Sequence, residues 1–510
     1  MSSPIKSHGT PSPSGAHATI GIEGPGFGVF GTVQASDLAG PRWAPTLHRS
    51  MMRACQRSSC LLLAWAAFAV VTASASGADR FALRGEIVTP EGVLSDGAVV
   101  ISGERIESVL RPPFPDGLRV VETGGIVLPG LIDLHNHLTW DVFPRWSAGT
   151  VFPNRYEWQQ LPAYLSALAG PHATLISGGH GPAMARYAEV KAIAGGATSL
   201  AGLYANDLGP GFAPPYPGMM RMLDLGSRLY PDGTPEPVRY EVFPLVLPQS
   251  TVEEIRADLA SGRLRSLLIH LAEGSPHDAS SAMEYRILKA RGLLMPGVTL
   301  IHGVALHREQ FEEMHRAGVG LVWSPRSNFE LYGATADVAA ASEAGVTISI
   351  APDWSPTGSD GMLEELAYAA RWNAALPKPL FTDAQLVRMA TSVPAALAGA
   401  GDKVGELRTG FMADVLVVRA ARGDAYHALV RSGPADVRMV MVGGRPLYGQ
   451  KALVESLAPA LPWTPIAVSG THEEVALPAD ATLGDWATLT QGLDRAMQKV
   501  GSHLGPLTSQ

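Results

Sequence analysis

Two histidines separated by a single residue follow an apolar stretch in the first third of the chain. Residues 127–137 read VLPGLIDLHNH, so His135 and His137 come directly after a run of aliphatic side chains. Residues two apart on a strand project from the same face, and both imidazoles can therefore reach one point beyond the strand end. Two buried imidazoles need a polar partner, and neutral imidazole is a common metal ligand. The spacing predicts a divalent metal site; the alternative is a chance pair of histidines in a loop.

Four later apolar segments also lead into residues that can do chemistry. These residues are His270 and Glu273 after segment 266–270, His302 at the end of 299–302, Arg326 and Asn328 after 320–324, and Asp353 and Trp354 after 347–351. A single polar residue at such a place is commonly a capped strand end. Five segments that end this way favour one shared site, because the active sites of parallel barrels lie at the carboxyl ends of the strands.

The central part of the chain alternates apolar, strand-like segments with helical patterns. Strands are expected over 126–135, 197–202, 219–225, 240–247, 266–270, 299–302, 320–324 and 347–351, and helices over 183–194, 252–261, 282–291 and 308–317. Eight strands with crossovers in a span of this length predict an α/β fold, the (β/α)8 TIM barrel. An open doubly wound sheet is the alternative, but no Gly-x-Gly-x-x-Gly follows an early strand.

Short strand-like segments flank the predicted barrel on both sides. They cover residues 83–88, 97–102 and 105–110 before it, and residues 413–418 and 437–442 after it. We therefore assign residues 79–124 together with 402–450 to one small β-sandwich domain, and residues 125–401 to the barrel. Residues 451–510 form a C-terminal tail in which a helix is expected over residues 486–500.

The first part of the chain contains the pattern of a secretory leader. Residues 51–57 are basic, residues 60–71 are apolar, and small residues follow, which together predict a signal peptide over residues 51–78. Translation would then start at Met51 or Met52, and residues 1–50 would be a mis-called or disordered extension. The apolar run is too short for a permanent membrane anchor, so a periplasmic or secreted protein is expected.

Composition narrows the classes of function. With 46% hydrophobic and 17% charged residues, the chain is globular rather than disordered. The formal net charge is -8 and basic residues do not cluster, so nucleic acid is not an expected partner. Both cysteines, Cys55 and Cys60, lie in the predicted leader, so His, Asp or Glu would hold any metal in the mature chain. The expected partner is a small-molecule substrate, and a homo-oligomer is compatible with the sequence.

Across about residues 80–450 the chain resembles the amidohydrolase superfamily of metal-dependent hydrolases. The resemblance rests on the PGLIDLHNH motif at residues 129–137, the His-x-x-Glu segment at residues 270–273, His302, Asp353 and the split β domain. The pattern is closest to the branch that contains cytosine deaminase and the chlorohydrolase-like deaminases. The metal ligands implied by this resemblance are His135, His137, His270 and Asp353, the implied acid/base is Glu273, and the residue implied to orient water or substrate is His302.

The resemblance implies hydrolysis of a carbon–nitrogen bond other than a peptide bond. A metal bound there lowers the pKa of water from about 15.7 towards about 7. Asp353 would take a proton from that water, Glu273 would pass a proton to the leaving group, and His302 would polarise the substrate. The predicted substrate contacts are Arg326, Asn328, Tyr332 and Trp354. The aromatic segment over residues 140–182 is expected to cover the mouth of the site; a packed surface excursion is the alternative.

The expected number of metal ions follows from the absence of a lysine at the ends of the predicted middle strands. Related enzymes with two metals bridge them by a carboxylated lysine at the end of a middle strand. Here no lysine lies between Lys191 and Lys289, Lys191 falls in a helical run as a surface or packing residue, and Glu241 is expected at the wrong end of its strand. We expect one divalent ion, zinc, with iron or manganese as alternatives. A two-metal, peptidase- or lactamase-like hydrolase and a non-catalytic binding protein remain the rival functions.

Overall fold

The computed structural model describes residues 80–508, apart from residues 211, 213, 227–228, 231–236, 421–422 and 478–482. The predicted leader over residues 51–78 and the segment 1–50 lie outside the described residues, and both stay predictions. Among the described helices, none combines the length and the apolar character that crossing a membrane requires.

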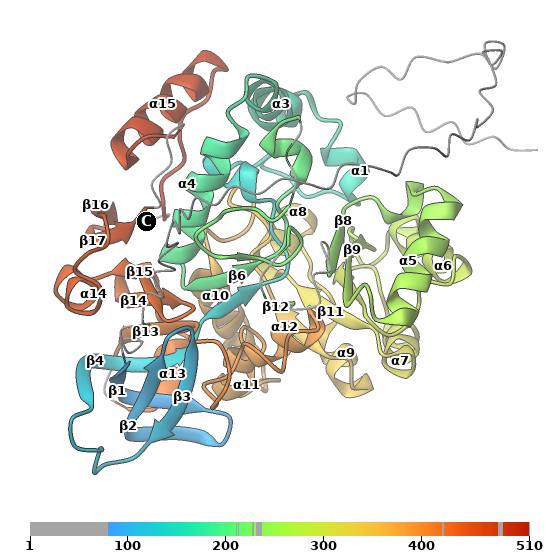
Figure 1. Ribbon diagram of the computed structural model, residues 1–510. Coiled ribbons are helices and arrows are strands. Elements are labelled where there is room, and N and C mark those ends of the chain that lie inside the picture. The colour runs from blue at the N-terminus through green and yellow to red at the C-terminus, as the bar shows by residue number, and fades with distance from the viewer. Residues whose placement is uncertain are drawn as a thin grey trace, which may run out of the picture. The chain divides into compact units, whose positions relative to one another are not determined.

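Eight strands in the central part of the sequence pair in parallel (Figure 1). They are β5 (Leu131–Asp133), β6 (Ala197–Leu200), β7 (Arg221–Met222), β8 (Val238–Glu241), β9 (Ser266–Leu271), β10 (Val298–His302), β11 (Gly320–Trp323) and β12 (Ile348–Ile350). They form two arcs, β5-β6-β7 and β8-β9-β10-β11-β12. The first and eighth strands meet through a parallel bridge between Asn136 and Asp353. The predicted (β/α)8 barrel is confirmed, although β7 and β8 share no ladder within the described residues.

The strands coincide with the predicted segments except at two places. The segment predicted as one strand over residues 126–135 is divided, because β4 (Arg119–Pro129) belongs to another sheet and β5 begins after it. The strand predicted over residues 240–247 is wrong in its second half. There β8 ends at Glu241, and Pro244–Val246 forms a 3₁₀ helix. Proline has no N–H to donate to a ladder, which explains why the strand does not continue.

The barrel strands are buried on both faces, and their side chains alternate between the inside and the outside. The inward-facing side chains, which pack on one another, include Ile132, Leu268, Ile301, Val322 and Ala351. The outward-facing side chains, which pack against the surrounding helices, include Leu131, Leu267, Ile269, Leu300 and Leu321. This double burial explains why the strands read as nearly continuous apolar runs.

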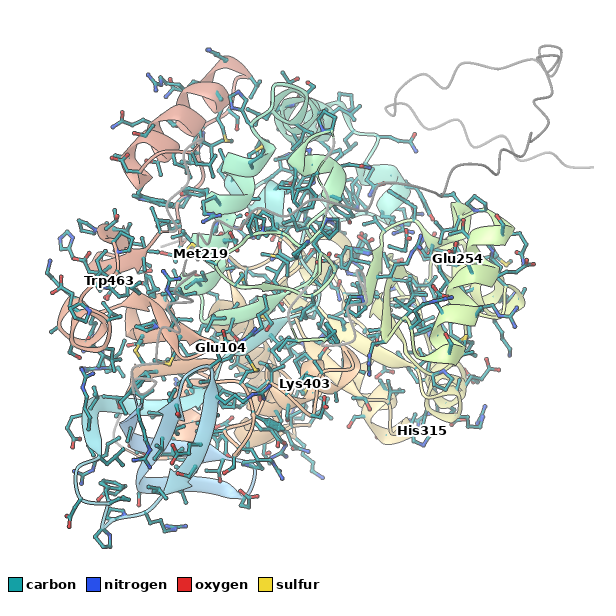
Figure 2. The ribbon with its side chains drawn as sticks, viewed as in Figure 1. Glu104, Met219, Glu254, His315, Lys403 and Trp463 are labelled. Carbon is teal, nitrogen blue, oxygen red and sulfur yellow. The ribbon has the colours of Figure 1, made fainter. Side chains whose placement is uncertain are left out.

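Helices connect the strands and cover the outside of the barrel (Figure 1). They are α4 (Gly181–Ala194), α5 (Gln249–Ser261), α6 (Ala279–Ala290), α7 (Arg308–Ala317), α8 (Pro325–Tyr332), α9 (Val338–Ala344), α10 (Met362–Ala375), α11 (Asp383–Arg388) and α12 (Ser392–Leu397). The helices α5 and α7 are amphipathic. In α5, Val252 and Ile255 are buried while Glu254 is exposed; in α7, Phe311 is buried while His315 is exposed (Figure 2).

Nine further strands form a second sheet in the order β16-β17-β15-β14-β13-β4-β1-β2-β3. Besides β4 they are β1 (Arg80–Thr89), β2 (Gly92–Ser102), β3 (Arg105–Leu110), β13 (Val415–Arg419), β14 (Val437–Val442), β15 (Arg445–Gly449), β16 (Trp463–Val468) and β17 (Thr471–Ala476), with α13 (Ala425–Leu429) and α14 (Lys451–Leu457) beside them. Because β4 pairs with β13, the segments before and after the barrel lie side by side. The sheet also extends past residue 450, since β16 and β17 come from the segment predicted as a tail.

Gly130 connects this sheet to the first barrel strand. Its N–H donates to Asp414 O at 3.0 Å. A Cβ atom at this position would lie 2.2 Å from Thr198 Oγ1 in β6, so only glycine permits the chain before β5 to approach β6 this closely. The sheet therefore leads directly into β5, which carries His135 and His137 beyond its end.

The segment between β5 and β6 folds over one end of the barrel, and the C-terminal residues pack on it. The elements are α1 (Arg155–Trp158), α2 (Pro162–Tyr164), α3 (Gly170–Ser177) and the C-terminal α15 (Trp486–Lys499), which matches the helix expected over residues 486–500. Leu489 and Leu493 of α15 belong to the same apolar cluster as Trp158. Tyr187 donates to Gly505 O at 2.6 Å. The C-terminal residues therefore stabilise the segment that covers the barrel.

A buried ion pair between the two sheets is expected to dominate their junction. Arg221 of β7 and Asp414 are 10% and 3% exposed at their side chains and are 2.6 Å apart. We expect Asp414→Ala to lower the free energy of unfolding by about 3–5 kcal/mol, because it leaves a buried guanidinium unpaired. In the exposed pair Arg308–Glu343, Glu343→Ala should change it by less than about 1 kcal/mol. Urea unfolding of both variants tests this; equal effects would contradict it.

Candidate metal centre

Three imidazole nitrogens and one carboxylate oxygen converge beyond the carboxyl ends of β5, β9 and β12. His135 Nε2 lies 3.1 Å from His270 Nε2, which lies 3.3 Å from His137 Nε2. Asp353 Oδ1 lies 3.2 Å from His135 Nε2 and 3.4 Å from His137 Nε2. His135, His270 and Asp353 are buried, and His137 is the partly accessible member. The structure therefore brings together the four residues predicted as metal ligands.

The four separations fit donor atoms that share one metal ion, because atoms bound to a zinc ion at about 2.0–2.1 Å lie about 3 Å from one another. Furthermore, His270 Nδ1 lies 3.4 Å from Glu241 O, so Nδ1 carries the proton and Nε2 is left with its lone pair. Lone pairs that face one another at such distances repel unless a cation lies between them. Three imidazole nitrogens and a carboxylate oxygen suit zinc, iron or manganese.

Hydrogen bonds behind the ligands fix their orientation. Asp133 accepts from the N–H of His135 at 3.0 Å and from the side-chain amide of Asn136 at 2.9 Å. His135 Nδ1 lies 2.7 Å from Ser324 Oγ. Partners of this kind fix the ring orientation of a ligating histidine. Sequence reasoning did not single out Asp133 or Ser324, although Asp133 lies inside the motif that carries the two histidines.

Asp353 is held through its second oxygen. Ser327 Oγ donates to Asp353 Oδ2 at 2.6 Å, which leaves Oδ1 for the two histidines of the first strand. Asp353 also has a φ of 74°, in the left-handed region. A non-glycine residue there costs about 1–3 kcal/mol and is found mainly where function demands it. The strained backbone turns the carboxylate from the end of β12 into the site.

Glu273 and His302 lie beside the four converging atoms. His302 Nε2 is 3.6 Å from Glu273 Oε2, and the ligand atoms of His135, His270 and His302 lie within 4.8 Å of one another. His302 Nδ1 lies 2.9 Å from Asn328 Oδ1. An amide oxygen accepts only, so His302 keeps its proton on Nδ1 and directs Nε2 towards the site. A carboxylate and an imidazole are thus available for proton transfer next to the metal ligands.

Two of the four predicted substrate contacts bond to these residues instead. Asn328 uses Oδ1 for His302, and its Nδ2 donates to Thr335 Oγ1 at 3.2 Å. Tyr332 donates to Glu273 Oε1 at 2.5 Å. Both side chains orient a neighbour within the protein, and a direct contact with substrate stays a prediction for each of them.

The other two predicted contacts differ in where they point. Arg326 Nη1 lies 3.3 Å from Ser359 Oγ and 3.6 Å from Glu364 Oε2. The Trp354 ring lies 6.0 Å from the His137 ring, next to the metal ligands. Of this pair, Trp354 is the residue that the structure brings beside the site.

Aromatic side chains of the covering segment surround Trp354. Its ring centroid lies 5.6 Å from that of Trp140, 6.0 Å from that of Trp158 and 6.5 Å from that of Tyr164. His172, in the same segment, stacks on Trp140 at 3.8 Å. The segment predicted as an aromatic cover over residues 140–182 therefore packs next to the ligand cluster.

Two tyrosines that sequence reasoning missed complete the surroundings of His137. The rings of Tyr204, after β6, and Tyr240, in β8, lie 6.4 and 6.1 Å from the His137 ring. Their hydroxyl groups are buried and have no hydrogen-bond partner among the described residues. A buried donor of this kind is unusual, and two of them beside the ligands mark where a bound molecule would be recognised. Neither tyrosine lies in a motif, so no signal in the sequence identifies them.

Two residues bear on whether a second metal ion could be bridged, Glu241 and Lys191. Glu241 lies at the carboxyl end of β8, not at the wrong end as predicted, because that strand ends earlier than expected. Its carboxylate accepts from Arg239 Nε at 2.7 Å. Lys191 is fully buried in α4 and pairs with Asp360 at 2.7 Å, so it is a packing residue and not a surface one.

Burial sets the protonation state of the ligand cluster. Removal from water lowers the pKa of His137 from 6.5 to about 4, and lowers the pKa of His135 and of His270 well below 6.5. Burial raises the pKa of Asp353, and the neighbouring histidines oppose this effect. All three imidazoles are therefore neutral near pH 7, which is the form that binds a metal.

Sequence comparison points in the same direction as the geometry. The sequence profile of the amidohydrolase family matches residues 249–447. The 5-methylthioadenosine/S-adenosylhomocysteine deaminase of Syntrophobacter fumaroxidans is 26% identical over 423 residues, which cover 74% of this chain and 95% of the relative. The enzyme of the same name from Halobacterium salinarum is 25% identical and covers 66% of this chain and 82% of the relative.

Solved structures show the same fold. An adenosine deaminase from Xanthomonas campestris with bound zinc superposes with a TM-score of 0.59 at 18% identity, covering 82% of this chain and 98% of that chain. The guanine deaminase of E. coli superposes with a TM-score of 0.54 at 17% identity, covering 73% of this chain and 100% of that chain. At these identities the likeness concerns the fold alone.

The depressed histidine pKa values make the stability of the metal-free protein depend on pH. Because the pKa of His137 is about 4 when folded and 6.5 when unfolded, its contribution is complete above pH 6.5 and is lost as the pH falls towards 4. We expect a loss on the order of 3 kcal/mol from this residue. Urea unfolding of chelator-treated wild type and His137→Asn between pH 7.5 and 4.5 measures it. An equal pH dependence in both proteins would contradict the assignment.

Proposed function

Because the chain belongs to the amidohydrolase superfamily, we propose that it is a metal-dependent hydrolase of carbon–nitrogen bonds other than peptide bonds, of the deaminase type. The observation that carries this proposal is the convergence of three imidazole nitrogens and one carboxylate oxygen within 3.1–3.4 Å of their neighbours. Relatives that align with most of this chain are named as deaminases.

The proposed cofactor is one divalent ion, zinc, held by the four predicted ligands. These are His135, His137, His270 and Asp353. When bound, such an ion lowers the pKa of water from about 15.7 to about 7 and so supplies a nucleophile at neutral pH. A zinc-containing structure of the same fold supports the choice of metal. Glu241 lies near this centre, but its carboxylate pairs with Arg239 Nε at 2.7 Å, which gives no support to a bridging role for Glu241 between two ions.

The chain's own residues would move the protons. Asp353, whose Oδ1 lies beside the Nε2 atoms of His135 and His137, would accept a proton from the attacking water, while Ser327 holds Oδ2. Glu273, whose Oε2 lies 3.6 Å from His302 Nε2 beside the cluster, would take up a proton from the attacking water and pass it to the departing nitrogen. His302 Nε2, which carries a lone pair, would accept a hydrogen bond from the attacking water or from the substrate. Groups placed in this way typically contribute about 10²–10⁴-fold each in rate.

The surroundings of the cluster favour a small substrate with an apolar, flat part and a hydrogen-bond acceptor. Trp354 and its aromatic neighbours offer faces and edges to a ring, and shield the site from bulk water. The free hydroxyls of Tyr204 and Tyr240 offer two donors on the side of His137. The acidic composition gives no support to nucleic acid as the substrate.

The first experiment combines metal analysis with ammonia release. We expect about one equivalent of zinc per chain, and turnover of a compound from a panel of 5-methylthioadenosine, S-adenosylhomocysteine, adenosine and guanine. His270→Ala should lose the metal, whereas Glu273→Gln should keep it and lose at least about 10²-fold in ammonia release. His315→Ala, on the exposed face of α7, is the matched histidine control and should change neither.

Other outcomes would decide between the rival functions. Two equivalents of metal would favour the two-metal, peptidase- or lactamase-like hydrolase. No metal after reconstitution would leave a binding protein on the same scaffold. Full activity of Glu273→Gln would contradict the role of Glu273 in proton transfer.

We also propose that the protein is exported, on the basis of the leader pattern at residues 51–78. Expression of the full chain in a bacterial host should release material into the periplasm or medium that begins between residues 76 and 79. N-terminal sequencing of the exported protein measures this. Protein that stays in the cell and retains residues 51–75 would contradict the proposal.

A further inference from the structure

Part of the covering segment runs along the backbone that carries Glu273. We call residues 152–158 the clamp segment. An antiparallel bridge joins Asn154 to Gly274, Arg155 N donates to Glu273 O at 3.2 Å, and Ser275 N donates to Pro153 O at 2.6 Å. At its other end, Phe152 N donates to Leu331 O at 2.8 Å, next to Tyr332. Residues 152–154 of the clamp segment thus pair like a short extra strand, α1 follows them, and the segment joins the loop after β9 to α8.

Arg155 of the clamp segment is buried beside the Glu273 carboxylate. It is 1% exposed. Its Nη1 lies 3.5 Å from Glu273 Oε2 and donates to Val242 O at 2.8 Å, while Nη2 lies 3.5 Å from Glu284 Oε1. A guanidinium is taken out of water only where buried partners compensate for the lost hydration. Here the partners are two carboxylates and a carbonyl.

Glu284, the second carboxylate beside Arg155, is held in place by hydrogen bonds of its own. Its carboxylate accepts from Ala272 N at 2.7 Å and from Tyr156 OH at 2.5 Å. These two bonds fix the Glu284 carboxylate behind Arg155. The Arg155 guanidinium therefore lies between this fixed carboxylate and the Glu273 carboxylate, which borders the site.

The second oxygen of Glu273 depends on the same segment. Trp158 Nε1 donates to Tyr332 OH at 2.9 Å, and Tyr332 donates to Glu273 Oε1 at 2.5 Å. Arg155 therefore holds Oε2 directly, and Trp158 holds Oε1 through Tyr332. Both oxygens of one carboxylate are oriented by residues that lie three apart in the clamp segment.

We propose that Arg155 and Trp158 are positioning residues for Glu273, and that Glu273 transfers protons only while the clamp segment is docked. This inference rests on the proposed role of Glu273, and adds to it the residues and the segment on which that role depends. A carboxylate that relays a proton must present one oxygen to His302 and the substrate. Releasing Arg155 or Trp158 frees the carboxylate to rotate, and the proton is then transferred less often without any change in the metal ligands.

The first arm of the test measures turnover of whichever compound of the panel the wild type hydrolyses. We expect Arg155→Met to keep one equivalent of zinc and to lower kcat by about 10²-fold with KM changed less than about threefold. Arg155→Lys should fall between this variant and the wild type, and Trp158→Phe, which removes only the indole N–H donor, should lower kcat by about 5–20-fold. Arg145→Met is the matched control, because Arg145 lies in the same covering segment and bonds to Gly358 O and Glu330 instead.

A double variant separates positioning from general damage. If Arg155 acts through Glu273, adding Arg155→Met to Glu273→Gln should lower kcat by no more than about twofold further. Independent losses that multiply in the double variant, or an unchanged kcat in Arg155→Met, would overturn the proposal.

The second arm needs no substrate. Hydrogen–deuterium exchange should be at least about tenfold faster at the amides of residues 152, 155 and 275 in Arg155→Met than in wild type, and unchanged there in Arg145→Met. Equal protection in Arg155→Met and wild type would overturn the docking part of the proposal. If the wild type binds zinc but hydrolyses nothing in the panel, the proposed function fails on its own, and this arm still decides whether Arg155 docks the clamp segment.

Discussion

The rest of this structure depends on one constraint: the Nε2 lone pair of His270 faces that of His135 at 3.1 Å and that of His137 at 3.3 Å. Such an arrangement is unfavourable by itself, since the rings lose hydration and gain only each other. It persists because the barrel backbone fixes β5 and β9 next to their neighbours, and a cation held between the rings would turn the repulsion into coordination. The second sheet also helps to position these histidines, because it leads through Gly130 directly into the strand that carries His135 and His137.

Local strain and hydrogen bonds then supply the orientation that strands alone cannot give. His302 and Asp353 both have φ values in the left-handed region, 71° and 74°. At each, the chain leaves its strand and turns the side chain over the barrel mouth. Ser327 and Asn328, adjacent on α8, each bond to one of these two side chains, at 2.6 and 2.9 Å. One helical turn therefore orients both the carboxylate that would bind the metal and the imidazole beside it.

The sequence predicts those parts of the molecule that repeat a local pattern. The barrel strands are continuous apolar runs, so their positions and the polar residues at their ends could be read directly, and His135, His137, His270 and Asp353 do meet. Contacts between distant segments could not be read. Arg155 lies 118 residues from Glu273, with no periodicity to connect them. Glu241 was misplaced because the apolar residues after it resemble a longer strand until Pro244 interrupts the ladder. The strands β16 and β17 were missed because their alternation is weak.

The covering segment joins two requirements that a hydrolytic site must satisfy together. Trp140, Trp158 and Tyr164 surround Trp354 and shield the ligand cluster from bulk water, which lowers the local dielectric and strengthens the charge interactions inside it. The same low dielectric makes an unpaired carboxylate costly, and Glu273 needs a compensating cation once water is excluded. Arg155 comes from the same stretch of chain as those rings. The guanidinium of Arg155 is therefore docked together with the rings that exclude bulk solvent. The Glu273 carboxylate thus has a positively charged partner whenever it is shielded from water.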